Sequence, residues 1–398
     1  MNWLDELVHQ HSELESPVSF WRWSALAALS AVLKDSIYLD RAGLYRLYPN
    51  IYVMLHADSG LKKGPPVSMA KQLVKLVNNT TIISGRSSIQ GIMQKMGTSQ
   101  TMPGGTIKRQ STVFICSSEL TSSIVEDKAA LEILTDLYDR NYNIDDWESI
   151  LKMGNIALNK PTVTMLTATN EAHAEEFFIK KDVQGGYIAR TFIIYEKKRN
   201  KVNSLMYKME HPPDYKKSAE YLKEIAKLHG EIIISEAGMK FYDEWYHEFV
   251  ATVDNSGMND STGTLNRFGD SVLKVAILLA LSDRPELTIE EIHLSRAVLL
   301  CEKLIGNMRK TTMGRGKSVF AQHKALLINE LIERDNHSIT RQMINKKFGL
   351  WATSNEWDEI LRDLAVADIL KIELQGTNTI VFMTDERARE LKRHLDGK

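Results

Sequence analysis

Cysteines and metal-ligand spacings are scarce in this chain. Its 398 residues include two cysteines, Cys116 and Cys301, each inside an apolar stretch and without a metal-binding spacing. So few cysteines are typical of a protein from a reducing compartment. The eleven histidines form no H-E-x-x-H motif or other ligand cluster, and the acidic residues show no metal-site spacing. The sequence therefore gives no support to a metal-dependent nuclease or a primase.

Long apolar runs and an excess of one charge are also missing. The longest apolar run, Val275 to Leu281, is too short to cross a bilayer, and Asp5 and Glu6 interrupt the first helix. We therefore expect a cytoplasmic protein without a membrane partner. The formal net charge is -1, so nucleic-acid binding would have to rest on local basic patches. The length and ordinary composition predict a globular protein of two to four domains.

Residues 51–75 have the arrangement of a phosphate-binding loop: a buried-type strand, a small-residue turn with lysines, and an amphipathic helix. Loop N–H groups and a helix N-terminus attract an anion, and a lysine adds a full positive charge. The candidate nucleotide-binding residues are Asp58, Ser59, Gly60, Leu61, Lys62, Lys63, Gly64 and Pro65. An ordinary strand–turn–helix with a solvated lysine pair is the alternative.

The match to the standard pattern G-x-x-x-x-G-K-[ST] is incomplete. With Lys63 as the motif lysine, Ala57 and Lys62 replace the two glycines, and Gly64 replaces the hydroxyl residue that normally helps to bind Mg²⁺. The chemistry of this stretch therefore depends on the rest of the chain.

Strands and helices alternate after this loop, which predicts an α/β domain with a parallel sheet and helices on both faces. The expected strands are 51–55, 81–84, 112–116, 162–167 and 191–195. Glu119 follows the third of them, where a nucleotide hydrolase places an acid that polarises water or binds the metal. Ser118 stands where an aspartate is usual, and a helix-capping serine followed by a first-turn glutamate is the alternative.

The flanking regions differ from this core. We expect an N-terminal helical segment at 1–45, the α/β core at 46–200, an all-α region at 201–312 and a separate C-terminal domain at 318–398. Three helices and a hairpin in the last region predict a winged helix. Its third helix is acidic, so any DNA contact there is better assigned to Arg341, Lys346 and Lys347, and protein docking is the alternative.

Together, the order and spacing of these segments resemble the hexameric AAA+ replicative helicases of the minichromosome-maintenance type, closest to a divergent branch from phages and mobile elements. The resemblance covers roughly residues 50–312. It implies an AAA+ P-loop core, an all-α lid and ATP and Mg²⁺ as cofactors. The catalytic residues it implies are Lys63 in the phosphate loop, Glu119 as acid and metal ligand, Asn170 as sensor 1, Arg190 as arginine finger and Arg267 as sensor-2 arginine, seven positions before Lys274.

The resemblance also implies a homo-oligomer, a hexameric ring, whose pore loops contact single-stranded or forked DNA. The pore residues would be Lys108, Arg109 and Lys152. We expect an ATP-driven helicase or translocase in phage or mobile-element replication, with a replication partner at the winged helix. Because Gly64 and Ser118 remove two usual metal ligands, a non-hydrolysing initiator or helicase-loader scaffold is the alternative.

Overall fold

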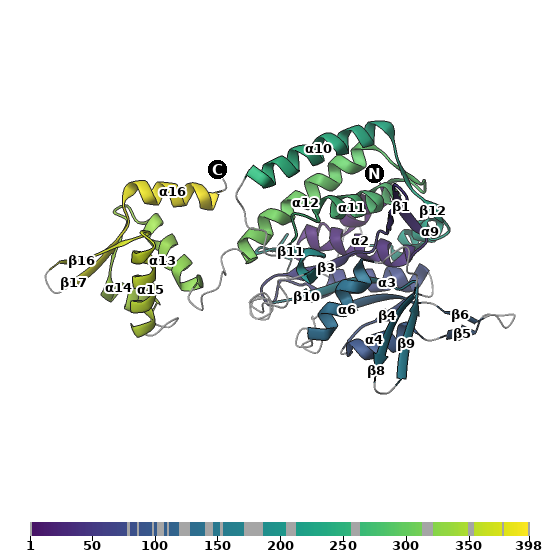
Figure 1. Ribbon diagram of the computed structural model, residues 1–398, viewed down its shortest axis with the longest axis horizontal. Coiled ribbons are helices and arrows are strands. Elements are labelled where there is room, and N and C mark those ends of the chain that lie inside the picture. Colours follow the sequence, from purple (N-terminus) through teal and green to yellow (C-terminus); the bar gives the residue numbers. More distant parts are fainter. Residues whose placement is uncertain are drawn as a thin grey trace. The chain divides into compact units, whose positions relative to one another are not determined.

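The structure is a computed structural model. It describes residues 2–77, 80–85, 87–97, 99–101, 107–109, 111–118, 128–139, 146–151, 154–170, 186–203, 212–255, 263–312, 321–348, 354–375 and 378–396. The chain divides into two compact units, Met1–Asn307 and Met308–Lys398 (Figure 1). The finer division of the first unit into segment, core and lid stays a prediction.

A parallel sheet of five strands lies at the centre of the first unit. Its strands are β3 (Tyr52–His56), β4 (Thr81–Ile83), β7 (Thr112–Ser117), β10 (Thr162–Thr169) and β11 (Thr191–Tyr195), in the order β11-β3-β10-β7-β4. All neighbouring pairs run parallel. Every residue of β3 and β10 is buried, as expected for central strands covered on both faces. The α/β prediction with a parallel sheet is confirmed.

Alternate residues of β3 point to opposite faces of this sheet. Val53 and Leu55 belong to the apolar core that includes α2 (Val18–Leu33), whose residues from Phe20 onward are buried except for one. On the other face, the Tyr52 hydroxyl donates to the carbonyl of Leu134 in α6 (Lys128–Tyr138), at 2.8 Å. Helices therefore cover both faces.

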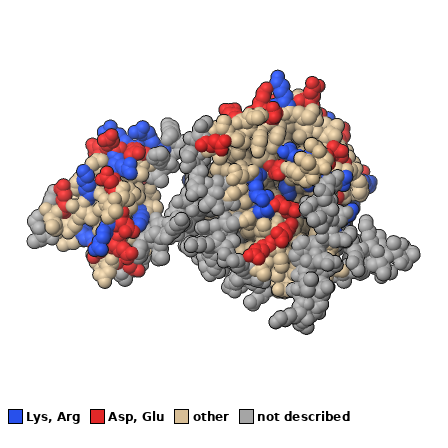
Figure 2. Space-filling model, in the orientation of Figure 1, with Lys and Arg blue, Asp and Glu red and all other residues tan. Residues whose placement is uncertain are grey.

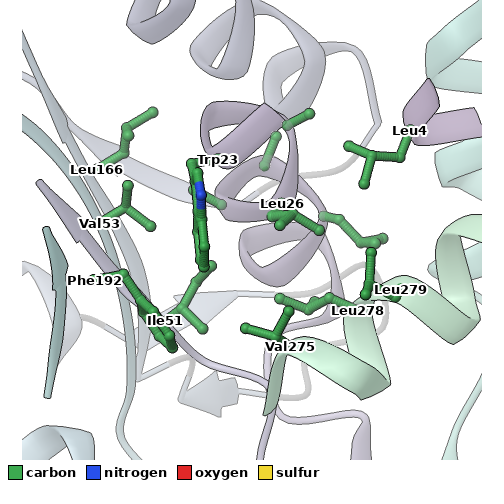
Figure 3. Packing of buried hydrophobic residues seen from close by; sticks show 14 of the residues in the cluster. Leu4, Trp23, Leu26, Ile51, Val53, Leu166, Phe192, Val275, Leu278 and Leu279 are labelled. Atoms are coloured by element: carbon green, nitrogen blue, oxygen red, sulfur yellow. The ribbon is translucent and has the colours of Figure 1, made fainter. Parts of the chain in front are cut away.

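Helix α2 lies between the sheet and the helical region. Trp23 packs on Phe192 of β11 with ring centroids 4.9 Å apart, and the other side of α2 meets α11 (Phe268–Asp283) (Figure 3). A helix that is apolar all round, as this one is, is a buried helix. The N-terminal helices are thus part of the core of the first unit.

The other helices of the first unit are α1 (Trp3–Gln10), α3 (Gly64–Val77), α4 (Ile89–Met96), α8 (Gly186–Ala189), α9 (Tyr215–Ile225), α10 (Glu236–Asn255) and α12 (Glu291–Thr312). Two hairpins lie in the regions where projecting loops are expected: β5 (Ser99–Thr101) with β6 (Ile107–Arg109), and β8 (Asp146–Leu151) with β9 (Gly154–Asn159). The predicted helix at 171–179 lies outside the described residues.

Short strands occur where helices alone were expected. β1 (Ile37–Arg41) pairs with β2 (Tyr45–Leu47) and, in parallel, with β12 (Gly230–Glu231), while β13 (Ile233–Ile234) pairs with β14 (Thr288–Ile289). Neither 1–45 nor 201–312 is therefore purely helical. In strands of two to five residues, the pattern of apolar residues is too short to distinguish the two-residue period of a strand from the 3.6-residue period of a helix.

The second unit contains the expected three helices and hairpin. The helices are α13 (Ala321–Glu333), α14 (Arg341–Phe348) and α15 (Ser354–Val366), and the hairpin strands are β16 (Lys371–Gln375) and β17 (Asn378–Phe382). A short strand, β15 (Ser338–Thr340), completes an antiparallel sheet in the order β15-β17-β16, and α16 (Asp385–Asp396) follows. Neither β15 nor α16 was expected from the sequence.

In the part of the chain that the structure describes, no helix has both the length and the apolar character needed to cross a membrane.

Candidate functional site

The loop after β3 presents Lys63 at the carboxyl edge of the parallel sheet. The Lys63 ammonium donates to the carbonyls of Ala57 and Asp58, at 2.7 and 2.9 Å, and so curls back over its own loop. Partial burial lowers the pKa of Lys63, and Asp58 opposes this shift. Helix α3 begins at Gly64, and because Pro65 and Pro66 have no N–H group, the N–H groups in its first turn are those of Gly64 and Val67.

The backbone of this loop turns sharply and is braced from outside. Gly60 and Lys62 have φ values of 89° and 50°, in the left-handed region that favours glycine. The Ser16 hydroxyl, from the segment between α1 and α2, donates to the carbonyl of Lys62 at 2.7 Å. A contact from a distant part of the sequence therefore stabilises the strained backbone conformation at Lys62.

The register places other predicted residues beside the loop. His56 of β3 lies opposite Thr169 of β10, and the N–H of Ala57 donates to the Thr169 carbonyl at 3.4 Å. Asn170 follows directly, at the same edge. Strand β7 pairs with the other side of β10, where Thr167 of β10 lies opposite Ser117 of β7. The exposed Ser118 follows Ser117 and therefore lies at the same edge. Glu119 lies outside the described residues.

The carboxyl edge of the parallel sheet is the usual position of a ligand site in an open α/β sheet. The chain leaves β3 at this edge toward α3, which packs with α2 on one face. The chain enters β11 at the amino edge through α8, which packs on α6.

The residues present fit the phosphates of a nucleotide better than they fit a metal ion. Lys63 donates only to carbonyls, which an anion can replace, and the N-terminus of α3 adds partial positive charge. Gly64 contributes no hydroxyl, and a Cβ placed there would meet no atom within 4 Å. Among the described residues, no group of three or more histidines, cysteines or acids is placed to bind a metal.

A second charged cluster lies at the opposite, amino edge of the sheet. Arg190 immediately precedes β11, and its Nε and Nη2 both donate to Oδ2 of Asp139, the first at 2.9 Å. Nη1 of Arg267 donates to the same oxygen at 2.8 Å. Nη1 of Arg190 also donates to the Gly186 carbonyl at 2.7 Å. The two predicted arginines thus meet on one carboxylate.

A buried lysine anchors the helix that carries one of these arginines. Nζ of Lys274, in α11, donates to the backbone and side-chain oxygens of Asn50 at 3.0 and 2.7 Å and lies 3.8 Å from the centre of the Tyr138 ring. Burial lowers the Lys274 pKa to about 7, and Asp139 and Asp270 partly oppose that shift. Lys274 therefore fixes α11, with Arg267 directly before its first residue, to the start of β3.

The structure brings Lys63, Asn170 and Ser118 to one edge, and Arg190 and Arg267 to the other. Sequence reasoning missed Asp139 and Ser16. One feature of the sequence singles out Asp139. It is a carboxylate directly after a helix, where the helix dipole disfavours negative charge. Nothing in the local sequence of Ser16 indicates a contact with residue 62, because that contact comes from the tertiary fold.

The predicted DNA contacts are only partly described. Lys108 and Arg109 lie in β6, but their side chains are not described, and Lys152 lies outside the described residues. In the second unit, Arg341 donates to Asp358 and Ser354 of α15, and Lys347 donates to Glu330 at 2.5 Å. Two of the three basic residues assigned to DNA there are therefore engaged in internal contacts.

The surface of the second unit has a hollow and exposed apolar side chains. A hollow of about 480 Å³ lies between α15 and the hairpin, and Leu361, Val366 and Ile372 contribute to its lining. Val366 and Leu374 are 84% and 80% exposed. On the face shown in Figure 2, acidic and basic side chains of the described residues are interspersed rather than gathered in one basic stripe.

No family model matches this chain, and no curated protein sequence matches it significantly.

Proposed function

We propose that this chain is an ATP-driven, ring-forming DNA helicase or translocase of the AAA+ type, similar to minichromosome-maintenance helicases and acting in phage or mobile-element replication. The observation that carries the proposal is the placement of charge on the parallel sheet. A lysine loop and a helix N-terminus lie at the carboxyl edge, and two arginines lie at the amino edge.

At the carboxyl edge, Lys63, the N–H of Gly64 and the partial positive charge at the start of α3 would bind the phosphates of ATP. Asn170 would orient the attacking water, and Glu119 would accept its proton. Mg²⁺, when bound with ATP, neutralises phosphate charge; Glu119 would contribute to its binding. Because Gly64 and Ser118 replace the usual ligands, phosphate oxygens and water would supply more of the ligands of the ion. We therefore expect slow hydrolysis.

At the amino edge, Arg190 and Arg267 would serve the nucleotide of a neighbouring chain. An arginine supplied in trans contributes about 10³ to 10⁵ in rate, or roughly 4 to 7 kcal/mol. A contact between the carboxyl edge of one chain and the amino edge of the next is head-to-tail, and such contacts close into a ring when the rotation allows. A hexamer is the assembly that the resemblance implies.

DNA would pass through the ring, where Lys108, Arg109 and Lys152 would contact the phosphates of a single strand without reading its sequence. The antiparallel sheet and helix order of the second unit support a winged helix. Because α15 is acidic and the nearby hollow combines apolar side chains with Arg341, Asp358 and Arg362, we assign this unit to a protein partner rather than to DNA.

A non-hydrolysing initiator or loader scaffold is the second candidate. Gly64, which lacks a hydroxyl, and the exposed Ser118 favour it. Such a protein would bind ATP at Lys63 without releasing phosphate.

The test measures ATP binding and phosphate release, with and without single-stranded DNA, in the wild type, in Lys63→Ala and in Lys75→Ala. Lys75 is an exposed lysine of α3 outside the loop and is the matched control. The motor account predicts DNA-stimulated release that is lost in Lys63→Ala and retained in Lys75→Ala. ATP binding without release would establish the scaffold, and the absence of ATP binding would contradict both candidates.

A further inference from the structure

We propose that Asp139 occupies, in the isolated chain, an anion site that Arg190 and Arg267 offer to a phosphate group, and that the phosphate must displace this carboxylate. The inference rests on the proposed function and concerns its regulation. Asp139 would act as an internal competitor, so that the two arginines become available only when a neighbour presents a nucleotide.

The geometry around Asp139 is that of an anion between two cations. A single oxygen, Oδ2, accepts N–H groups from Nε and Nη2 of Arg190 and from Nη1 of Arg267. One carboxylate thus supplies one negative charge to two guanidinium groups. A terminal phosphate, with more charge and three acceptor oxygens, matches two guanidinium groups better than one carboxylate oxygen does.

The position of Asp139 on its helix has no local explanation. It follows directly after α6, whose C-terminal end carries partial negative charge. A carboxylate there is unfavourable for the helix. Among the described residues its ion-pair partners are the two arginines, and its charge also acts on the buried Lys274, so its place is explained by these cations and not by α6.

The exposure of the three side chains shows how the exchange would proceed. Arg267 and Asp139 are 45% and 41% exposed, whereas Arg190 is 8% exposed. An incoming phosphate can therefore reach Arg267 first. Arg190 can use its Nε and Nη2 groups for the phosphate only after Asp139 has left them, while the Gly186 carbonyl continues to position Nη1.

The consequence is a low activity of chains that are not assembled. In a single chain, Asp139 neutralises part of the charge that the arginines would use on a phosphate. In an assembly, the nucleotide of the neighbour competes for both arginines, and Asp139 turns outward to solvent. The carboxylate would thus couple the charge at this edge to the presence of a nucleotide-bound neighbour.

The experiment measures binding of inorganic pyrophosphate by calorimetry to full-length chains that carry Lys63→Ala, so that the loop at the other edge contributes little. The variants add Asp139→Asn, Asp139→Ser, or Asp139→Asn with Arg267→Ala. Asp136→Asn is the matched control, because Asp136 is an exposed acid on the same helix with the same charge.

We expect Asp139→Asn and Asp139→Ser to tighten pyrophosphate binding about tenfold or more, since each removes a charged competitor. The gain should disappear with Arg267→Ala and be absent in Asp136→Asn. Unchanged or weaker binding in the neutral variants would overturn the proposal. If neither neutral variant folds, as judged by thermal melting, Asp139 is a fixed structural counter-ion and the proposal is also wrong.

The failure of this inference can be distinguished from the failure of the proposed function. Pyrophosphate binding at the arginines requires neither ATP hydrolysis nor a ring. A wild type that neither binds nor hydrolyses ATP would contradict the proposed function, whereas the pyrophosphate measurement reports on the arginine site alone.

Discussion

Lys63 and Arg190 lie at opposite ends of the same parallel sheet. Arg190 directly precedes the residue that pairs with Tyr52, and the loop of Lys63 follows His56 at the other end of β3. At about 3.3 Å per residue, these two ends of β3 are about 13 Å apart. The two side chains therefore lie at opposite edges of the sheet, and under the proposed function a catalytic site that uses both would take them from two chains.

The role of α2 in the core gives a first prediction. Trp23 is 2% exposed and packs on Phe192. We expect Trp23→Ala to lower the free energy of unfolding by about 3 to 5 kcal/mol, because the substitution leaves a large cavity between sheet and helix. Denaturant titration of the full chain measures this change.

Arg22→Ala, at the neighbouring and less buried position of α2, is the control and should cost far less. A loss below about 1 kcal/mol in Trp23→Ala would mean that α2 does not pack between the sheet and α11.

Lys274 predicts a pH dependence of stability. Burial lowers its folded pKa to about 7, below its ordinary value of 10.5 in the unfolded chain. Between these values the unfolded chain binds more protons, so stability rises with pH by up to about 1.4 kcal/mol per unit. The penalty for burying the charged lysine is fully present below pH 7. We expect a rise from pH 7 to 9.5 in the wild type.

Lys274→Met should remove this rise, whereas Lys240→Met, at an exposed lysine of α10, should retain it. Thermal or denaturant unfolding at a series of pH values measures the effect. A wild type and a Lys274→Met variant with parallel pH profiles would show that Lys274 is not buried as described.

We expect a gain of function when serine replaces Gly64. A Cβ placed there meets no atom within 4 Å, and Gly64 is the first residue of α3, where a hydroxyl would restore the usual metal ligand. We expect Gly64→Ser to lower by several-fold the Mg²⁺ concentration needed for half-maximal phosphate release. Gly64→Ala adds the same Cβ without the hydroxyl and should not do so. Equal Mg²⁺ dependence in Gly64→Ser and wild type would remove this position from the metal site.

Much of the fold follows from periodicity. Runs such as Thr162–Thr169 are long and rich in β-branched residues, and alternation with helices predicts their parallel arrangement, so the strands of the sheet were predicted within two residues. Elements of two to five residues, such as β1 and β12, were missed, because they form through pairing between distant segments. The same limit applies to β15 in the second unit.

The candidate site was predictable to a smaller extent. A lysine that follows a buried strand and a turn of small residues is expected at the edge of the sheet, and Lys63 lies there. The meeting of Arg190, Arg267 and Asp139 combines residues from three separate segments. No spacing in the sequence indicates such a meeting. The brace from Ser16 to Lys62 is of the same kind.

The most direct test of the account mixes two variants that are each inactive. Chains with Lys63→Ala lack the phosphate lysine, and chains with Arg267→Ala lack an arginine at the other edge. In a two-chain site, equal and random mixing leaves about a quarter of the contacts with both groups intact. We predict that DNA-stimulated phosphate release returns to about that fraction of wild type in the mixture. Activity that stays at the level of the separate variants would contradict a site shared between chains.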